Sequence, residues 1–424
     1  MTTVLDAAAL DLRQFIRSGD QILWGQACGE PLTLTEALVA QRAAIGPASV
    51  FLGSGFSKTL QPEHADHLTF SGIGGIGTHR RLTAAGKLAV LPCHVGQIAG
   101  YIRGGQIRCD VVFVQVARTA HPDKFSFAAV NDYVQEAIDK ARVVVAEVNE
   151  RAPDTRCDKL LSRSRIDWLI QTSRPLVSVA PANIGQVERA IAHHASAFIH
   201  NGATLQIGVG AIPDAIAQLL VDRRNLGVHS GMLGDSVVDL MQAGAVNNSL
   251  KPIDAGITVT GMLIGSQRLF DFAHRNDSIV LQPSHYTHGE TTLAKLPNLV
   301  TVNTALEVDL SGQSNAEQTG DDYVGGVGGQ ADYVRAGNRS PGGHSILAMP
   351  ATALQGKVSR ICAALSGPVT NTRAEADILV TEFGAAQLRG QSIPERARRL
   401  IAIAHPDFRE ALAEQAARLL QRGY

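Results

Sequence analysis

The chain has few cysteines, few aromatic residues and no dominant sign of charge. Its five cysteines, Cys28, Cys93, Cys109, Cys157 and Cys362, are widely spaced and include no Cys-x-x-Cys pair. An odd number of dispersed cysteines argues against a disulfide framework or a structural zinc site and is typical of a reducing cytoplasm. The 38 basic and 39 acidic residues give a net charge of −1. A nucleic-acid-binding domain is far more basic, so we expect no nucleic-acid partner.

Long hydrophobic runs and targeting signals are also absent. No stretch of about 18 uninterrupted apolar residues occurs, so we expect no membrane span. The first residues, MTTVLDAAALDLRQF, contain no charged region followed by a long apolar run, so no secretory signal is expected. These absences predict a soluble protein located in the cytoplasm.

Several motifs that define enzyme classes are missing or incomplete. No G-x-S-x-G elbow of a serine hydrolase and no P-loop motif occurs. The pairs His193–His194 and His285/His288 lack further ligands, so we expect no metal site. Gly72–Gly77 matches G-x-G-x-x-G, but the next acid is Asp110, which is too distant for a dinucleotide site. A glycine loop that lines a cleft, or a plain turn, is the better interpretation.

The chain does contain short β-branched runs that alternate with helical patterns, and 45% of its 424 residues are hydrophobic. Such alternation predicts an α/β fold with mainly parallel sheets covered by helices. One series of strands and helices ends near residues 181–188 and another begins, which predicts two domains, 1–185 and 186–424. The expected strands include Leu88–Leu91, Val111–Val116, Val143–Val148, Leu176–Ala180, Thr204–Gly208, Ile257–Gly261, Ile279–Leu281, Leu299–Val302 and Ile378–Thr381. The expected helices include Asp132–Lys140, Val187–Phe198, Pro213–Leu220, Ser236–Ala243, Ser266–His274 and Pro406–Leu420.

Two segments combine glycines with possible chemistry. Gly208 and Gly210 follow a strand and precede a helix start, where backbone N–H groups bind anions; a structural turn fits equally well. Glu307 lies in an apolar run upstream of a glycine loop, Gly325–Gly329, within the long, irregular stretch Asp309–Arg339. A carboxylate in this position is a possible nucleophile, although a solvent-facing strand glutamate explains the pattern equally well.

The sequence resembles the acetyl-CoA hydrolase/transferase family, a branch of the class I CoA-transferases that includes 4-hydroxybutyrate, butyryl and itaconate CoA-transferases. The similarity extends over nearly the whole length. Its clearest segments are ARVVVAEVNERAPDT (141–155), GATLQIGVGAIPDAI (202–216), LGVHSGMLGDSVVDLMQAGAVNN (226–248), NTALEVDLSGQSNAE (303–317), GVGGQADYVRAG (326–337) and ILVTEFGAAQLRG (378–390). The resemblance implies two related open α/β domains with the active site in the cleft between them, assembled as a homodimer or a dimer of dimers.

The resemblance also implies a mechanism and assigns roles. Glu307 would attack an acyl-CoA and pass through an acyl anhydride to a glutamyl-CoA thioester, from which a second carboxylate takes the CoA. Gly384 and a backbone amide near Tyr286 would stabilise the oxyanion. The segment Gly326, Val327, Gly328, Gly329 and Gln330 would bind CoA, with Gly208 and Gly210 in the same cleft. No permanently bound cofactor is implied, because CoA and acyl-CoA are substrates.

The acyl substrate is open at this stage. Butyrate and 4-hydroxybutyrate fit the family, and a dicarboxylate such as itaconate or succinate would need a cation, for which Arg80 and Arg81 are available next to the glycine loop. Two other functions compete with CoA transfer. One is acyl-CoA hydrolysis at the same Glu307, with water as the acceptor. The other is non-catalytic acyl-CoA binding, which needs the glycines but not the nucleophile.

Overall fold

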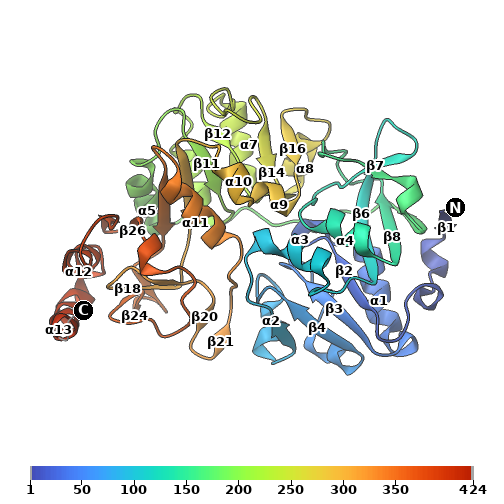
Figure 1. Cartoon of the computed structure of the whole chain (residues 1–424), viewed down its shortest axis with the longest axis horizontal. Helices are drawn as coiled ribbons and strands as arrows, with labels where there is room; N and C mark the ends of the chain where they lie inside the picture. The colour runs from blue at the N-terminus through green and yellow to red at the C-terminus, as the bar shows by residue number, and fades with distance from the viewer. Residues whose placement is uncertain (1, 422–424) are drawn as a thin grey trace.

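Two sheets, each with helices packed on it, form the two halves of the molecule (Figure 1). The computed structural model describes residues 2–421. The first sheet uses residues between Thr3 and Thr172, and the second uses residues between Thr204 and Gln387. Both are mainly parallel, so the predicted α/β class is confirmed. The connecting stretch, residues 173–185, contains no helix or strand.

The first sheet has the strand order β1-β10-β8-β6-β2-β3-β4-β5, and all of these neighbours are parallel. Its strands are β1 (Thr3–Leu5), β2 (Gln21–Trp24), β3 (Ala48–Leu52), β4 (Leu68–Gly72), β5 (Leu88–Val90), β6 (Val111–Arg118), β8 (Val143–Asn149) and β10 (Trp168–Thr172), with β7 (Lys124–Ser126) and β9 (Leu161–Ser162) attached antiparallel. The helices of this half are α1 (Leu32–Ile45), α2 (Arg80–Ala84), α3 (Val95–Gly104) and α4 (Val134–Lys140). Strands β6 and β8 are buried almost throughout, as their unbroken valine-rich runs predict.

The second sheet has the order β12-β11-β17-β22-β26-β27, with only the last pair antiparallel. Its strands are β11 (Thr204–Ile207), β12 (Gly227–Val228), β17 (Leu299–Asn303), β22 (His344–Ala348), β26 (Ile378–Thr381) and β27 (Gly384–Gln387). The helices are α5 (Gln186–Ser196), α6 (Ala211–Gln218), α7 (Asp235–Gln242), α8 (Gln267–Ala273), α9 (Ser284–Thr287), α10 (Glu290–Leu293), α11 (Gln330–Arg339), α12 (Ile393–Ala402) and α13 (Pro406–Leu420).

Short strands complete the second half. They are β13 (Met232–Leu233) with β15 (Met262–Leu263), β14 (Thr258–Thr260) with β16 (Ile279–Leu281), β18 (Glu307–Asp309) with β19 (Ser314–Asn315) and β25 (Ile361–Cys362), β20 (Gln318–Thr319) with β21 (Asp322–Tyr323), and β23 (Thr352–Ala353) with β24 (Val358–Ser359). Strands β18, β20, β21 and β24 lie together below the second sheet in the view of Figure 1.

Two local predictions are wrong. Leu176–Ala180 forms no strand, although Leu176 and Val177 are buried. Prolines at positions 175 and 181 bracket this segment and remove backbone donors that a ladder would need. The irregular stretch Asp309–Arg339 includes helix α11, whose residues Ala331, Tyr333 and Val334 are buried. Its polar composition concealed a helix that buries only one face.

The two halves share backbone hydrogen bonds and one apolar core. The N–H of Leu263 donates to the Ala129 carbonyl, and the N–H of Ser284 donates to the Asp132 carbonyl. One continuous cluster of buried apolar side chains includes residues of both sheets, from Leu23 to Val380. The position of one half relative to the other is therefore set by packing rather than by a flexible linker alone.

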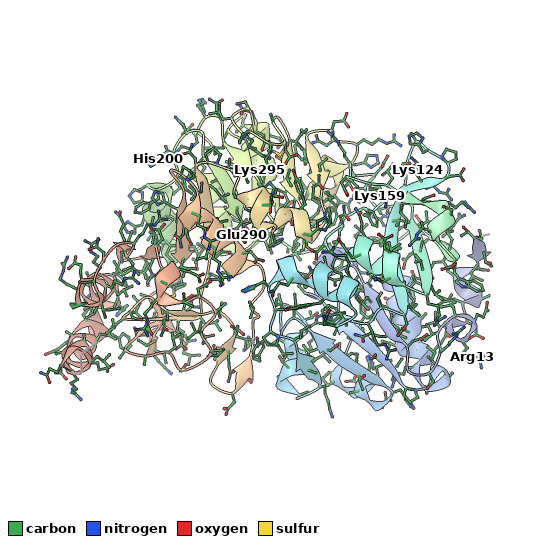
Figure 2. The ribbon with its side chains drawn as sticks, in the orientation of Figure 1. Arg13, Lys124, Lys159, His200, Glu290 and Lys295 are labelled. Atoms are coloured by element: carbon green, nitrogen blue, oxygen red, sulfur yellow. The ribbon has the colours of Figure 1, made fainter. Side chains whose placement is uncertain are left out.

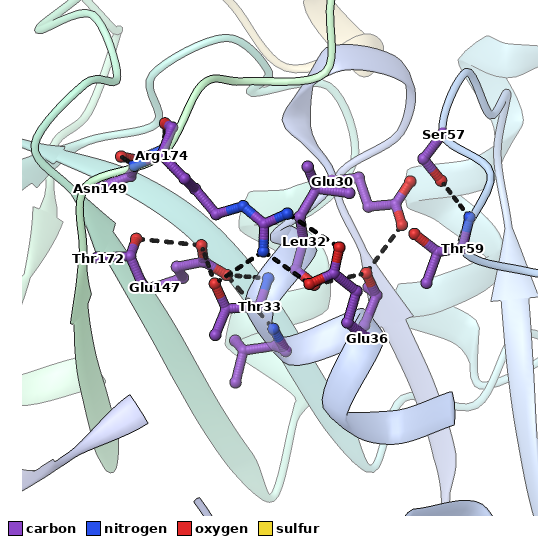
Figure 3. Close-up of polar contacts among 12 residues, drawn as sticks. Glu30, Leu32, Thr33, Glu36, Ser57, Thr59, Glu147, Asn149, Thr172 and Arg174 are labelled. Atoms are coloured by element: carbon purple, nitrogen blue, oxygen red, sulfur yellow. Dashed lines mark hydrogen bonds and ion pairs between the residues drawn. The ribbon is translucent and has the colours of Figure 1, made fainter. Parts of the chain in front are cut away.

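A buried polar network fixes the start of α1 against the first sheet. Glu147 of β8 is fully buried, and its carboxylate accepts hydrogen bonds from the Thr33 and Leu34 N–H groups and from the Thr33 and Thr172 hydroxyls (Figure 3). Lys124 is one of the exposed charged side chains on the surface of the same half (Figure 2). Among residues 2–421 we find no helix long and apolar enough to cross a membrane.

Candidate active site

A cleft of about 400 Å³ lies between the two halves. The first half contributes side chains that include Gln26, Ser54, Phe56, Ile73 and Ile76, and the second half contributes side chains that include Gln206, Ser230, Met232, His288, Asn303, Gln330 and Tyr333. None of the described residues on this wall is Asp, Glu, Lys or Arg. The cleft is therefore apolar with a few neutral hydrogen-bonding groups, which is the usual composition of a small-molecule site.

Strand ends explain why polar groups gather there. Gln206 is in β11, Ser230 follows β12, and Asn303 ends β17. These three parallel strands are adjacent, so the residues at their carboxyl ends meet at one edge of the sheet, where ligands bind in α/β folds. Gln206 and Asn303 exchange side-chain hydrogen bonds, of which Asn303 Nδ2 to Gln206 Oε1 is 3.0 Å.

The two glycine stretches noted in the sequence meet at the mouth of this cleft. The N–H of Gly75 donates to the Gly325 carbonyl at 2.9 Å, and the N–H of Val95 donates to the Gly328 carbonyl at 3.0 Å. A Cβ on Gly74 would lie 2.1 Å from the Gly325 oxygen, so only glycine allows this approach. Ile73, Ile76 and Gly77 line the cleft, so the prediction of a cleft-lining glycine loop is confirmed.

Of the predicted CoA-binding segment, Gly328, Gly329 and Gln330 line this cleft, whereas Gly326 and Val327 are not among its lining residues. Gly326 instead packs against the Ile73 carbonyl. Gly208 and Gly210 lie at a neighbouring pocket of about 440 Å³, which also includes Arg360. The two pockets share Val209, Met232 and Asn303 and are therefore neighbours along the sheet edge.

His288 is the one histidine among the described residues of the cleft wall. It is 7% exposed, and burial lowers its pKa to about 3, so the imidazole is neutral at pH 7. The ring lies against Gly231 and Gly329: a Cβ on either residue would lie 2.5 Å or less from a ring atom. Nδ1 is 2.9 Å from the Thr287 hydroxyl.

Glu307 lies outside this wall, in the small sheet of β18, β19 and β25. Its Oε1 accepts hydrogen bonds from Asn315 Nδ2 at 2.9 Å, from the Ser366 N–H at 2.8 Å and from the Gly367 N–H at 3.1 Å. The Ser366 hydroxyl contacts both carboxylate oxygens. In this arrangement the carboxylate holds the loop that follows β25.

The predicted oxyanion donors are likewise separate from the cleft wall. Gly384 begins β27, pairs with Thr381 and packs near Ile403. The Tyr286 N–H donates to the Pro283 carbonyl at 2.9 Å, so it would have to leave this turn to serve as an oxyanion donor. The Tyr286 hydroxyl donates to Asp254, and burial raises its pKa to about 12. The structure therefore brings the glycine loops and Gln330 together, but not Glu307, Gly384 and Tyr286.

Comparison with known proteins identifies the family of this chain. Residues 7–181 match the acetyl-CoA hydrolase/transferase N-terminal domain, and residues 265–416 match the C-terminal domain of the same family. The chain belongs to the acetyl-CoA hydrolase/transferase family. The predicted family and the predicted class of enzyme, a CoA-transferase, are confirmed.

Three relatives match this chain over nearly their whole length. It is 38% identical to the 4-hydroxybutyrate coenzyme A transferase of Clostridium kluyveri over 410 residues, 94% of each chain. It is 35% identical to the succinyl-CoA:cyclohexane-1-carboxylate CoA transferase of Geobacter metallireducens, covering 95% of this chain and 93% of the relative. The crystal structure of RipA from Yersinia pestis superposes with a TM-score of 0.92 at 30% identity, covering 98% of this chain and 97% of RipA.

Several cleft residues of this acetyl-CoA hydrolase/transferase family member were missed by sequence reasoning. Ser230 and Asn303 could have been found, because each follows or ends a strand of the parallel sheet. Gln26 and Ser54 lie in loops of the first half and carry no comparable signal. His288 was considered only as a metal ligand. Among the described residues no group of three or more His, Cys, Asp or Glu side chains could hold a metal ion.

Proposed function

We propose that this chain moves CoA between an acyl-CoA and a small carboxylic acid, with the acyl group in the uncharged cleft. The single observation that supports this is that the two pockets adjoin, with Val209, Met232 and Asn303 lining both of them. The pocket at Gly208–Gly210 and the N-terminus of α6 suits the CoA moiety, since glycines allow close backbone approach; Arg360 and Glu188 also line it. The cleft then receives the acyl end.

The wall of the cleft points to a neutral acyl chain. Burying a second carboxylate without a cationic partner is costly, and the wall offers none among its described residues. Arg80 and Arg81 are exposed on α2 and do not line the cleft. We therefore favour a monocarboxylate such as butyrate or 4-hydroxybutyrate over itaconate or succinate. The neutral Ser230 and Asn303 side chains suit a hydroxyl better than a second charge.

The glutamyl route requires a carboxylate that reaches the thioester carbonyl. Glu307, the nucleophile that the resemblance implies, would attack the acyl-CoA, and its thioester would then pass CoA to the acceptor. For this attack Asn315 and the Ser366–Gly367 loop must release a carboxylate that now accepts five hydrogen bonds from four donor groups. Movement of this loop is therefore part of the proposal.

Intact-protein and peptide mass spectrometry tests the route. Wild type, Glu307→Gln and the exposed control Glu290→Gln are mixed with butyryl-CoA without an acceptor. We expect a CoA adduct on wild type and on the control, mapped to the peptide that contains Glu307 and discharged by added carboxylate. An adduct that maps to another acid, or that persists in Glu307→Gln, refutes Glu307 as the nucleophile.

Acyl-CoA hydrolysis is a second candidate, and one observation favours it. The cleft wall has no carboxylate to form a covalent intermediate, whereas its neutral polar groups could hold a water molecule next to the thioester. The same samples separate the two functions. Steady release of CoA without an adduct, insensitive to added butyrate or acetate and to Glu307→Gln, would establish hydrolysis. Acceptor-dependent release through the adduct would establish transfer.

A further inference from the structure

Arg360 is a half-buried cation on the wall of the second pocket, the one that includes Gly208 and Gly210. Its Nε donates to the Leu306 carbonyl at 2.7 Å, and its Nη2 donates to the Ala305 carbonyl at 2.8 Å. These two bonds use one edge of the guanidinium. Nη1 makes no hydrogen bond to a described residue and is not a buried atom, so it is accessible from solvent. The guanidinium therefore has N–H donors left for a ligand.

No described acid forms an ion pair with this cation. Glu382 is the acid whose charge acts on Arg360, but its carboxylate accepts the Ala351 N–H at 2.8 Å instead of pairing with the guanidinium. Glu188 lines the same pocket, and its carboxylate accepts the Gly185 N–H at 2.8 Å. Burial lowers the pKa of Arg360, because water is removed and no anion replaces it, yet an arginine stays charged at pH 7. An anionic ligand would compensate this charge.

The order of strands places Arg360 away from the glycine turn of the pocket. Gly208 and Gly210 follow β11, whereas the backbone N–H of Arg360 donates to the carbonyl of Ala351, which follows β22. Strand β17 lies between β11 and β22. The side-chain bonds of Arg360 hold the two residues that immediately precede Glu307. Arg360 therefore borders the strand of the proposed nucleophile, and the glycine turn that suits CoA lies on the other side of β17.

We propose that Arg360 binds the carboxylate of the acid substrate in this pocket. This assignment rests on the proposed transfer of CoA to a small carboxylic acid. A guanidinium forms strong charge-assisted hydrogen bonds to a carboxylate. The CoA ester of the same acid has lost that negative charge, so the cation binds the acid and releases the ester. A single carboxylate suits the site better than the phosphates of CoA, because Arg360 is the one cation among the described lining residues and Glu188 is on the same wall.

The two half-reactions test this role, because only the second one needs an added acid. Wild type is compared with Arg360→Gln and Arg360→Lys. Arg223→Gln is the matched control, since Arg223 also donates to two backbone carbonyls, those of Ile199 and Ser196, but lines neither pocket. In Arg360→Gln we expect the CoA adduct to form from butyryl-CoA within threefold of the wild-type rate.

The second half-reaction should respond differently. In Arg360→Gln the KM for acetate is expected to rise about 10–100-fold with little change in kcat, which is the usual effect of losing a hydrogen bond to a charged group. Arg360→Lys, which keeps the charge, is expected to recover part of this loss. Arg223→Gln should resemble wild type in both half-reactions.

Calorimetric titration tests the site without turnover. Butyramide has the shape of butyrate but no charge, and each compound is titrated into wild type and into Arg360→Gln. We expect wild type to bind butyrate at least tenfold more tightly than butyramide, and Arg360→Gln to bind the two within threefold of each other. Equal binding of both compounds by wild type, or a preference for butyrate that persists in Arg360→Gln, overturns the assignment.

The outcomes separate this assignment from the proposed function. An unchanged KM for acetate in Arg360→Gln overturns the role of Arg360 even where CoA transfer is confirmed. Adduct formation that slows as much as acetate use would mean that Arg360 only supports the strand of Glu307, which refutes carboxylate binding. A loss seen with butyryl-CoA but not with S-butyrylpantetheine, which lacks the phosphates, would assign Arg360 to CoA instead. If wild type turns over no acyl-CoA, the proposed function fails, and the comparison of butyrate with butyramide still decides whether Arg360 binds a carboxylate.

Discussion

The position of His288 depends on two residues that have no side chain. A Cβ at position 231 would lie 2.5 Å from Cε1 and 2.7 Å from Nε2 of the imidazole, closer than van der Waals contact allows. We therefore expect Gly231→Ala to displace the ring and to lower the free energy of unfolding by about 1–3 kcal/mol, the usual cost of overpacking. Urea denaturation of the variant measures this cost.

A double-mutant cycle shows whether the clash with the imidazole is the cause. In a His288→Ala background the space is empty, so adding Gly231→Ala is expected to cost less than about 0.5 kcal/mol. The coupling between the two sites should then account for most of the loss. An equal cost in both backgrounds would mean that backbone conformation, rather than the ring, explains the effect.

Burial of His288 also predicts how stability depends on pH. Its pKa is lowered to about 3 in the folded state, against 6.5 as the ordinary value. Between these values the unfolded chain binds a proton that the folded chain does not. This contribution to stability is therefore complete above pH 6.5 and is lost as the pH falls, by about 1.4 kcal/mol per pH unit.

The variant His288→Gln isolates this contribution, because His229 and the buried acids titrate in both proteins. Urea denaturation from pH 7 to pH 4.5 should show the free energy of unfolding of wild type falling more steeply than that of the variant. The expected difference in slope is about 1.4 kcal/mol per pH unit. Parallel slopes would mean that the folded protein binds a proton at His288.

At the site, sequence reasoning found backbone features better than side-chain neighbours. Gly328, Gly329 and Gln330 were predicted, because glycine loops are recognisable from the sequence alone, and they line the cleft. His288 was set aside because it lacks a metal-binding pattern, and its position on the cleft wall depends on contacts with Gly231 and Gly329, which are distant in sequence. Glu307 was predicted to be functional because its neighbours in sequence are apolar. The structure places it in a separate small sheet instead of on the cleft wall.

Among elements, α1 begins without a capping side chain of its own. Pro31 precedes the helix and provides no side-chain acceptor, so Glu147 of β8 accepts the first-turn N–H groups instead (Figure 3). Glu147→Ala would leave these buried donors unpaired, and we expect a loss of about 2–3 kcal/mol in the free energy of unfolding.

The neighbouring Glu36 is a suitable control for this prediction. It forms a partly exposed ion pair with Arg174, so Glu36→Gln is expected to cost less than about 1 kcal/mol. Urea denaturation followed by circular dichroism compares the two variants. If Glu147→Ala and Glu36→Gln lower the free energy of unfolding by the same amount, charge in this region matters more than the missing cap of α1.

The contact between the two glycine loops is also an element-scale feature. Gly74→Ala places a Cβ 2.1 Å from the Gly325 carbonyl oxygen, so one loop must move. Because these loops border the cleft, we expect at least tenfold weaker butyryl-CoA binding by isothermal titration calorimetry, about 1.4 kcal/mol. Gly100→Ala in α3 meets no atom within 4 Å and should bind as wild type does. Equal affinities of the two variants for butyryl-CoA would mean that the contact between the glycine loops does not affect binding.

Element prediction succeeded where the pattern was local. Ile279–Leu281, Ile378–Thr381 and helix Pro406–Leu420 were predicted with their observed bounds, since β-branched runs and a proline-started helix are local signals. Seven strands of the first sheet, β1 to β4, β7, β9 and β10, were not among those predicted. Their short mixed segments are strands because neighbours in the sheet complete their hydrogen bonds, which a single segment does not show.

At the scale of the whole molecule, the halves are too tightly joined to unfold separately. Residues 129–132 and 156–158 of the first half make backbone hydrogen bonds to residues 261–263 and 281–284 of the second half. The apolar core is continuous from one sheet to the other. Unfolding one half alone would therefore expose buried apolar surface and leave backbone groups of the other half unpaired.

We therefore expect one cooperative transition, even though the chain has two sheets. Both tryptophans, Trp24 and Trp168, lie in the first half, so their fluorescence reports on that half alone, whereas far-ultraviolet circular dichroism reports on the whole chain. Urea curves from the two probes should coincide. A fluorescence transition that precedes or follows the dichroism would show two independent folding units, and the geometry of the cleft would then depend on a weaker junction than the shared core indicates.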